Sequence, residues 1–173
     1  MGATGQWIPW QDRQEWSQVV ESITTAIAGL GEEEERLREI SRQIEDWYAE
    51  LDGLLDSLGA ITCCSCTTIC CTMATIWYDL RDLLFLYLAD NRLPRQQITR
   101  NADRTCVHLT PQGCCLNRRD RPFICTWYIC AAQKAALMRQ QNGAGKEIFA
   151  FIDQLKMARK ELENRFVDAV SIS

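Results

Sequence analysis

The 173-residue chain has one histidine, and neither flank contains a cysteine, because every cysteine lies between Cys63 and Cys130. No segment can cross a bilayer: the most apolar one, 73–89, is interrupted by Asp79, Arg81 and Asp82, whose burial in lipid is costly. The first ten residues have no basic region and no unbroken apolar run, so no secretory signal is expected. We therefore expect a cytoplasmic protein without a membrane span, in which thiols stay reduced.

Alternation of apolar and polar residues, the pattern of strands, is also missing, whereas helical periodicity is common. The segment 32–58 opens with four glutamates, which favour the positive end of a helix dipole, and Gly59 closes it. Its apolar residues follow heptad a/d spacing: Leu37, Ile40, Ile44, Trp47, Leu51, Leu54 and Leu58. Further helices are expected over 16–30, 73–89, 123–141 and 148–169. We predict an all-α fold, with residues 1–173 forming one domain of about five bundled helices.

The apolar seam of 32–58 has two interpretations. It can form the internal core of the bundle, which is our prediction because 47% of the chain is hydrophobic. The alternative is an intermolecular coiled coil, in which a second copy packs along the seam to form a homo-oligomer.

The ten cysteines are concentrated in one segment, 63–130, which indicates a site. Disulfides suit small secreted domains that lack a core. This chain has no visible secretory signal and is long and apolar enough to form a core. Metal ligation is therefore the better interpretation. The candidate metal ligands are Cys63, Cys64, Cys66, Cys70, Cys71, Cys106, Cys114, Cys115, Cys125 and Cys130.

Helix lengths suggest how these thiols meet. The first cysteine group follows the helix 32–58, and the helix 73–89 then carries the chain about 25 Å away at the helical rise. The connection 90–121 is unusually long for a compact domain, which often marks function. We predict that it travels back along the bundle, with 95–104 as a short helix, so that two loops form one metal site at one end.

The second cysteine group resembles a known family. Cys106-Val107-His108-Leu109, Gly113-Cys114-Cys115 and Arg121-Pro122-Phe123-Ile124-Cys125 match C-x-x-L, G-x-C and R-P-x-x-C of the YkgJ-like cysteine-cluster family. The upstream run of Cys63, Cys66, Cys70 and Cys71 is similar to that family's C-x-x-C-x-x-C-C, with one extra residue before Cys70. Cys64 and Cys114 are additional thiols. The resemblance, which covers 63–130, implies a domain that chelates zinc or iron.

Several thiols and few imidazoles favour a soft metal. Thiolates select zinc, copper(I) or iron–sulfur centres, and ten thiols exceed the four ligands of one zinc site. Three closely spaced cysteines with a remote fourth are typical of [4Fe–4S] binding. We therefore predict an iron–sulfur cluster, with zinc as the alternative. Arginines of the connection can offset thiolate charge, and with the net charge at −4 they do not indicate nucleic-acid binding.

Two classes of function follow. The first is a redox protein that passes electrons to a partner protein or binds a small molecule at the cluster. The second is a structural or metal-handling zinc module. An enzyme is also open, since such cysteine clusters occur in proteins that resemble flagellin lysine methylases, although this chain has no Gly-rich nucleotide loop. We expect Asp103 and Asp120 to be turn residues, Trp127 and Tyr128 to shield the site, and His108 to lie off it.

Overall fold

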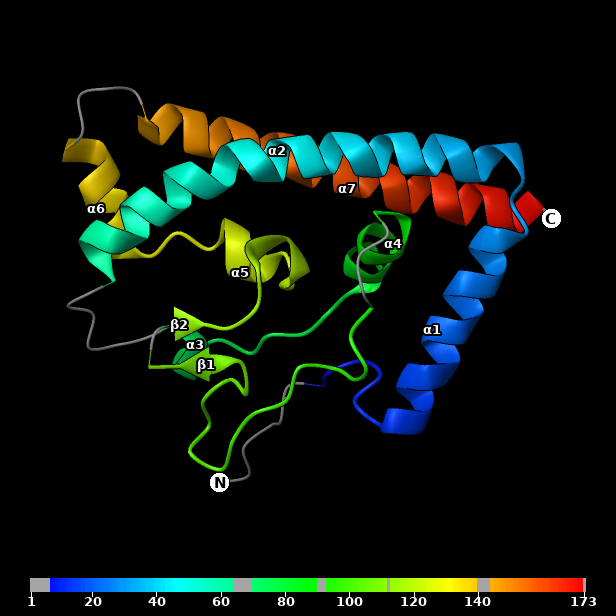
Figure 1. Ribbon diagram of the computed structural model, residues 1–173, viewed down its shortest axis with the longest axis horizontal. Coiled ribbons are helices and arrows are strands. Elements are labelled where there is room, and N and C mark those ends of the chain that lie inside the picture. Colours follow the sequence, from blue (N-terminus) through cyan, green and yellow to red (C-terminus); the bar gives the residue numbers. More distant parts are fainter. Residues whose placement is uncertain (1–6, 64–69, 90–92, 112, 140–143, 173) are drawn as a thin grey trace.

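Two long helices lie side by side along the molecule, and each contributes a stripe of buried residues to its core (Figure 1). The computed structural model describes residues 7–63, 70–89, 93–111, 113–139 and 144–172. Helix α2 spans Glu32–Thr62 and α7 spans Ala144–Ile172. Their apolar stripes face inward, as predicted, and the most deeply buried members are Leu37, Ile44, Leu51, Leu58, Ile148, Ile152, Leu155 and Leu162.

The buried face of α2 includes only part of the predicted a/d seam. Leu37, Ile44, Leu51 and Leu58 are buried, but Ile40, Trp47 and Leu54 are only partly so, and their places are taken by Ser41, Tyr48 and Leu55. The reason is the helix α4 (Leu80–Leu88), which packs against this side. Tyr48 stacks on Phe85 with ring centroids 5.4 Å apart, and Ser41 Oγ donates to the Phe85 carbonyl at 3.5 Å.

Helix α4 covers only the second half of the predicted helix 73–89. Asp79 caps it: its carboxylate accepts from Asp82 N at 2.9 Å, and the Asp82 carboxylate accepts from Asp79 N at 3.0 Å. This capping box fixes the helix start at Leu80. Residues 75–79 are non-helical and connect α4 to the short helix α3 (Cys70–Met73). The prediction of one helix was wrong because the local capping signal outweighed the apolar run.

Helix α1 (Arg13–Ala28) packs on α4 at the end opposite the cysteine-rich elements (Figure 1). Asp12 caps its start through Gln14 N at 2.7 Å. Trp16, which is 2% exposed, donates its indole N–H to the Pro94 carbonyl at 3.0 Å and so ties α1 to the long connection.

The connection 93–121 runs back along the bundle, as predicted, but residues 95–104 form no helix. The side chain of Gln97 instead attaches the first part of this connection to the backbone of Tyr78. This buried side chain accepts from Tyr78 N at 2.7 Å and donates to Tyr78 O at 3.0 Å, as a strand neighbour would. The connection ends in a two-stranded hairpin, β1 (Leu109–Thr110) and β2 (Gly113–Cys114), followed by the 3-10 turn η1 (Arg118–Asp120).

The predicted helix 123–141 is divided. Helix α5 spans Ile124–Trp127 and α6 spans Ala131–Arg139, with Tyr128 extended between them. Cys130 starts the second piece, because its N–H donates to the side chain of Gln133 at 3.1 Å, one half of a capping box. Cys125 therefore lies on α5, whereas Cys130 immediately precedes α6. Residues 140–143 fall outside the described chain.

The fold is mostly helical, which confirms the all-α prediction at that level. The described part contains seven α-helices, against about five expected, and the hairpin was not predicted. Within the described residues, no helix combines the length and apolarity that a membrane span needs.

Candidate metal centre

The first cysteine group lies where α2 ends. Cys63 follows the last turn of α2, with its N–H bonded to the Gly59 carbonyl at 2.8 Å. Cys70 and Cys71 begin α3. Cys64 and Cys66, both predicted ligands, lie outside the described residues.

The second group meets the first through the backbone. Cys106 N–H donates to the Cys71 carbonyl at 3.2 Å. Arg100, which pairs with Cys106 in an isolated bridge, places its guanidinium on the Thr72 carbonyl at 3.2 Å and on the Ala74 carbonyl. The connection is therefore attached directly to the segment after Cys71. The structure thus brings these two sequence-distant cysteine segments together at one end of the bundle, while the metal site that they were predicted to form stays a prediction.

The hairpin decides which of two adjacent thiols faces inward. Gly113 has φ +108°, a conformation that L side chains rarely adopt, which explains glycine in the G-x-C motif. Cys114, next in the strand, lines an inner cavity. Cys115 is exposed, and its sulfur lies 3.7 Å from His108 Nδ1. The family pattern matches Cys115, but the structure brings Cys114 to the other thiols.

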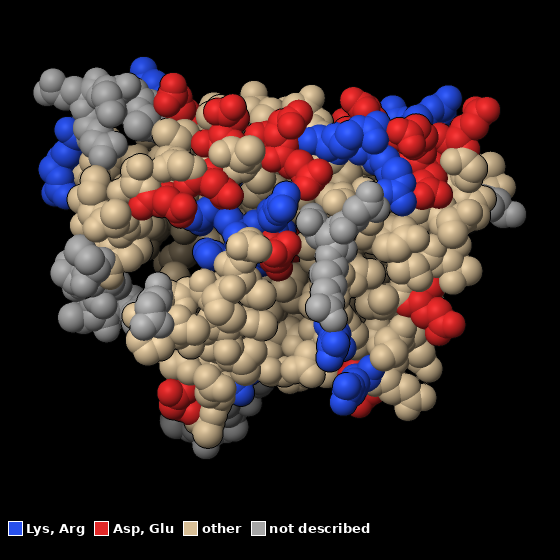
Figure 2. All heavy atoms as spheres, viewed as in Figure 1, with Lys and Arg blue, Asp and Glu red and all other residues tan. Residues whose placement is uncertain are grey.

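Acidic side chains fix the segment that carries Cys125. Arg118 lies between Asp52 and Asp56 of α2, with Nε 2.7 Å from the Asp52 carboxylate, and Arg119 reaches Glu45 at 3.3 Å. Acidic and basic side chains consequently intermingle over α2 and η1 on the face in Figure 2. Farther along, the buried Asp82 carboxylate accepts the Phe123 N–H at 3.0 Å, two residues before Cys125.

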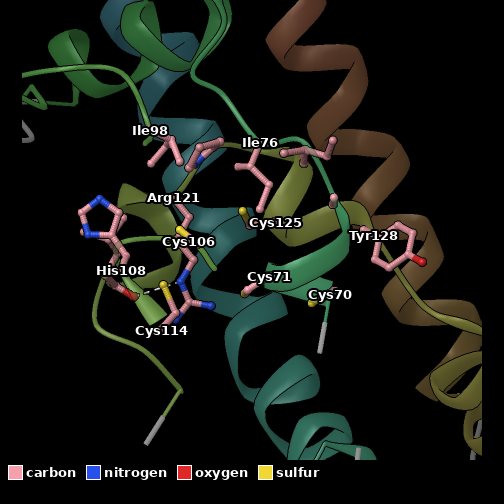
Figure 3. A pocket seen from close by; sticks show the side chains of 14 residues that line it. Cys70, Cys71, Ile76, Ile98, Cys106, His108, Cys114, Arg121, Cys125 and Tyr128 are labelled. Carbon is pink, nitrogen blue, oxygen red and sulfur yellow. Dashed lines mark hydrogen bonds between the residues drawn. The ribbon is translucent and has the colours of Figure 1, made fainter. Parts of the chain in front are cut away.

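Five thiols from both groups line the inner cavity, which has a volume of about 130 Å³ (Figure 3). They are Cys70, Cys71, Cys106, Cys114 and Cys125. The remaining wall is mainly apolar, with Ile76, Ile98 and Ile124, and includes Arg121. His108 also lines it, so this histidine lies closer to the thiols than predicted.

A larger outer cavity of about 720 Å³ adjoins the inner one. Cys70, Cys125, Arg121 and Tyr128 line both. Two more thiols line only the outer cavity, Cys63 and Cys130. Gln133 lies between these two: its side chain accepts from Cys130 N at 3.1 Å and its amide nitrogen is 3.9 Å from Cys63 Sγ. Tyr128 lines both cavities, whereas Trp127 lines neither.

The thiols perturb one another electrostatically. Burial raises the pKa of Cys125 to about 12, and the nearby Cys114 and Cys106 act in the same direction. A hydrogen bond from the Cys71 thiol lowers the pKa of Cys70 to about 6, and the same interaction with burial raises the pKa of Cys71. Arg121 favours the thiolate at both Cys70 and Cys125. Burial lowers the pKa of His108, so its ring is neutral at pH 7.

The donor set fits a soft metal, although the described thiols are spaced too widely to share one ion. None of the eight described cysteines forms a disulfide. Within the described chain, no three Cys, His, Asp or Glu side chains are close enough to hold an ion. Sulfur ligands of one zinc ion lie about 3.8 Å apart, given bonds of about 2.3 Å, so binding requires the thiols to approach one another. Thiols and a neutral imidazole are the ligand types that bind zinc, copper(I) or iron–sulfur centres.

The other predicted residues behave as turn groups. The Asp103 carboxylate accepts from Thr105 N at 2.9 Å, and Asp120 accepts from the Asn117 amide at 3.1 Å. Sequence reasoning missed Asp82 and Arg159, which support Cys125 from behind. The pattern Asp79-x-x-Asp82 before an apolar run is a helix-capping signal that could have pointed to Asp82. Nothing in the sequence around Arg159 indicates that this side chain is buried.

Comparisons of the chain with models of known protein families, with curated proteins and with solved structures found no match. The resemblance to the cysteine-cluster family therefore stays a prediction that rests on the motif residues alone.

Proposed function

We propose that this protein binds a thiolate-ligated metal centre, an iron–sulfur cluster with a redox or small-molecule-binding role, and that it is a distant relative of the YkgJ-like cysteine-cluster proteins. One observation carries the proposal: five thiols from two segments more than thirty residues apart line a single cavity. Thiol groups gathered in this way repel one another once ionised, unless a cation offsets their charge.

The surroundings of the thiols support a redox role. The inner cavity has a mainly apolar wall, and exclusion of water together with nearby charges tunes the potential of a cluster. Arg121 lines the cavity with no carboxylate within ion-pair distance in the part of the chain that the structure describes, so it can offset negative charge on the thiolates. An electron-transfer partner protein would approach through the outer cavity.

Zinc is the second candidate, in a structural or metal-handling module. The inner cavity, about 130 Å³, has room for one ion, and four of its five thiols would complete a tetrahedral site. In that case the metal would tie α3, the hairpin and α5 together without redox chemistry.

Anaerobic purification followed by an absorption spectrum and by iron, sulfide and zinc analysis distinguishes these candidates. A brown protein with thiolate-to-iron charge-transfer absorption and matching iron and sulfide is the expected result. A colourless protein with stoichiometric zinc would establish the second candidate. A protein that retains neither metal, and takes up neither when reconstituted, would refute the proposal.

A further inference from the structure

The eight described thiols do not form one set. Cys71, Cys106 and Cys114 line only the inner cavity, whereas Cys63 and Cys130 line only the outer one. Cys70 and Cys125 line both. The division follows the fold, because the inner thiols come from α3, the connection and the hairpin, while the outer pair comes from the end of α2 and the start of α6.

The outer pair is held together by contacts that the inner thiols do not share. Gln133 reaches from the first turn of α6 to Cys130 N and to Cys63 Sγ, and α6 packs on α2. Cys63 is exposed and Cys130 is partly buried, so both can be reached from solvent. Cys63 follows α2 and Cys130 precedes α6, so the packing of these two helices brings both thiols to the wall of the outer cavity.

We infer that the outer cavity holds a second metal site, anchored by Cys63 and Cys130, beside the one in the inner cavity; this inference rests on the proposed function. The ligand count supports it. Three thiols confined to the inner cavity and one shared thiol make four ligands, which close a tetrahedral site. The outer pair and the other shared thiol make three, which leave a position open, as in metal sites that bind an exogenous ligand.

The ligand class of the outer site follows from its donors. Three thiols bind a soft, thiophilic ion, and the open position suits a small thiol or another soft donor. The arginines of this cavity do not form an anion site of their own, because Arg118 is paired with Asp52 and Asp56, and Arg121 is shared with the thiols of the inner cavity. The outer cavity is therefore suited to a soft cation rather than to a small anion.

Anaerobic titration of the metal-stripped full chain with Co²⁺ tests the inference, since Co²⁺ in tetrahedral thiolate sites absorbs strongly. We expect two equivalents for the unmodified protein and one for the Cys63→Ser/Cys130→Ser variant. Cys115→Ser is the matched control: Cys115 is exposed, lines neither cavity, and its loss should leave two equivalents. One equivalent in the unmodified protein, or two in the double variant, would overturn the second site and leave the proposed function intact. No bound Co²⁺ at all would overturn both.

A second measurement needs no substitution. Mass spectrometry after iodoacetamide treatment reports the labelling of each cysteine with and without bound metal. At two equivalents, labelling of Cys63 and Cys130 should fall at least tenfold, and at one equivalent it should stay high because the closed inner site fills first. Labelling of both that is unchanged at saturating metal would refute the second site even if the double variant fails to fold.

Discussion

Arg159 of α7 donates a 2.6 Å hydrogen bond to the Asp82 carboxylate of α4, and both side chains are buried. The same carboxylate oxygen accepts the Phe123 N–H at 3.0 Å, and the guanidinium lies 4.7 Å from the centre of the Phe123 ring. One buried ion pair thus joins two core helices to the segment that ends in Cys125. The candidate metal centre and the bundle core share this support.

Asp82→Ala should destabilise the protein by about 3–5 kcal/mol, because the buried Arg159 charge then keeps, among the described residues, only the partly exposed Asp79 carboxylate, 3.5 Å away, as a partner. Urea unfolding followed by far-UV circular dichroism measures this loss. Arg81→Gln is the matched control, since Arg81 also joins α4 to α7, through Glu163 at 2.8 Å, but lies near the surface. It should cost about 0–1 kcal/mol. Equal losses in the two variants would contradict the structural role given to the buried pair.

Cys114→Ser should lower the metal content of the purified protein severalfold, whereas Cys115→Ser should leave it unchanged. The reason is position, since Cys114 lines the inner cavity and its exposed neighbour does not. Metal analysis of the two variants, purified in parallel without oxygen, compares two thiols that are adjacent in sequence. The family motif alone gives the opposite expectation, so the result decides between the motif and the cavity.

Metal binding should become tighter as pH rises from 6.5 to 7.5. In the metal-free protein the raised pKa values of Cys125, at about 12, and of Cys71 keep both thiols protonated over this range, so a metal must displace their protons. Each displaced proton makes affinity rise about tenfold per pH unit. Competition with a chelator of known affinity at the two pH values measures the slope. An affinity that does not change with pH would show that the thiols were already ionised.

Gly113→Ala should destabilise the protein by about 1–3 kcal/mol, because φ +108° is strained for any side chain. Gly53→Ala, in the exposed middle of α2, should instead stabilise it by about 0.5–1 kcal/mol. At both positions a new Cβ meets no atom within 4 Å, so only the backbone conformation differs. Thermal unfolding of both variants gives the comparison, and a neutral Gly113→Ala would remove the conformational reason for this glycine.

Ile44→Asp tests the seam of α2. Ile44 is fully buried inside the molecule, and a charge there should cost several kcal/mol of stability. We expect a monomer both before and after the substitution, measured by light scattering, together with a lowered urea midpoint. A dimer that separates into folded monomers of unchanged stability would instead assign this face to a second copy.

The sequence by itself determined the long helices and the concentration of thiols. The stripes of 32–58 and 148–169 became α2 and α7 because apolar residues at helical spacing must be buried on one face. Local spacing also indicated the return of the connection, since the apolar segment after Cys71 had to lead away from the first cysteine group.

Tertiary contacts decided which side chains face which cavity. Tyr48 replaced Trp47 in the core because Phe85 packs on that side of α2, a contact between residues far apart in sequence. Likewise, the hairpin turned Cys114 inward and Cys115 outward, although the two thiols are chemically identical. Cys114 is the last residue of β2 and Cys115 follows it, and only the packing of the rest of the chain determines which of the two thiols faces the cavity.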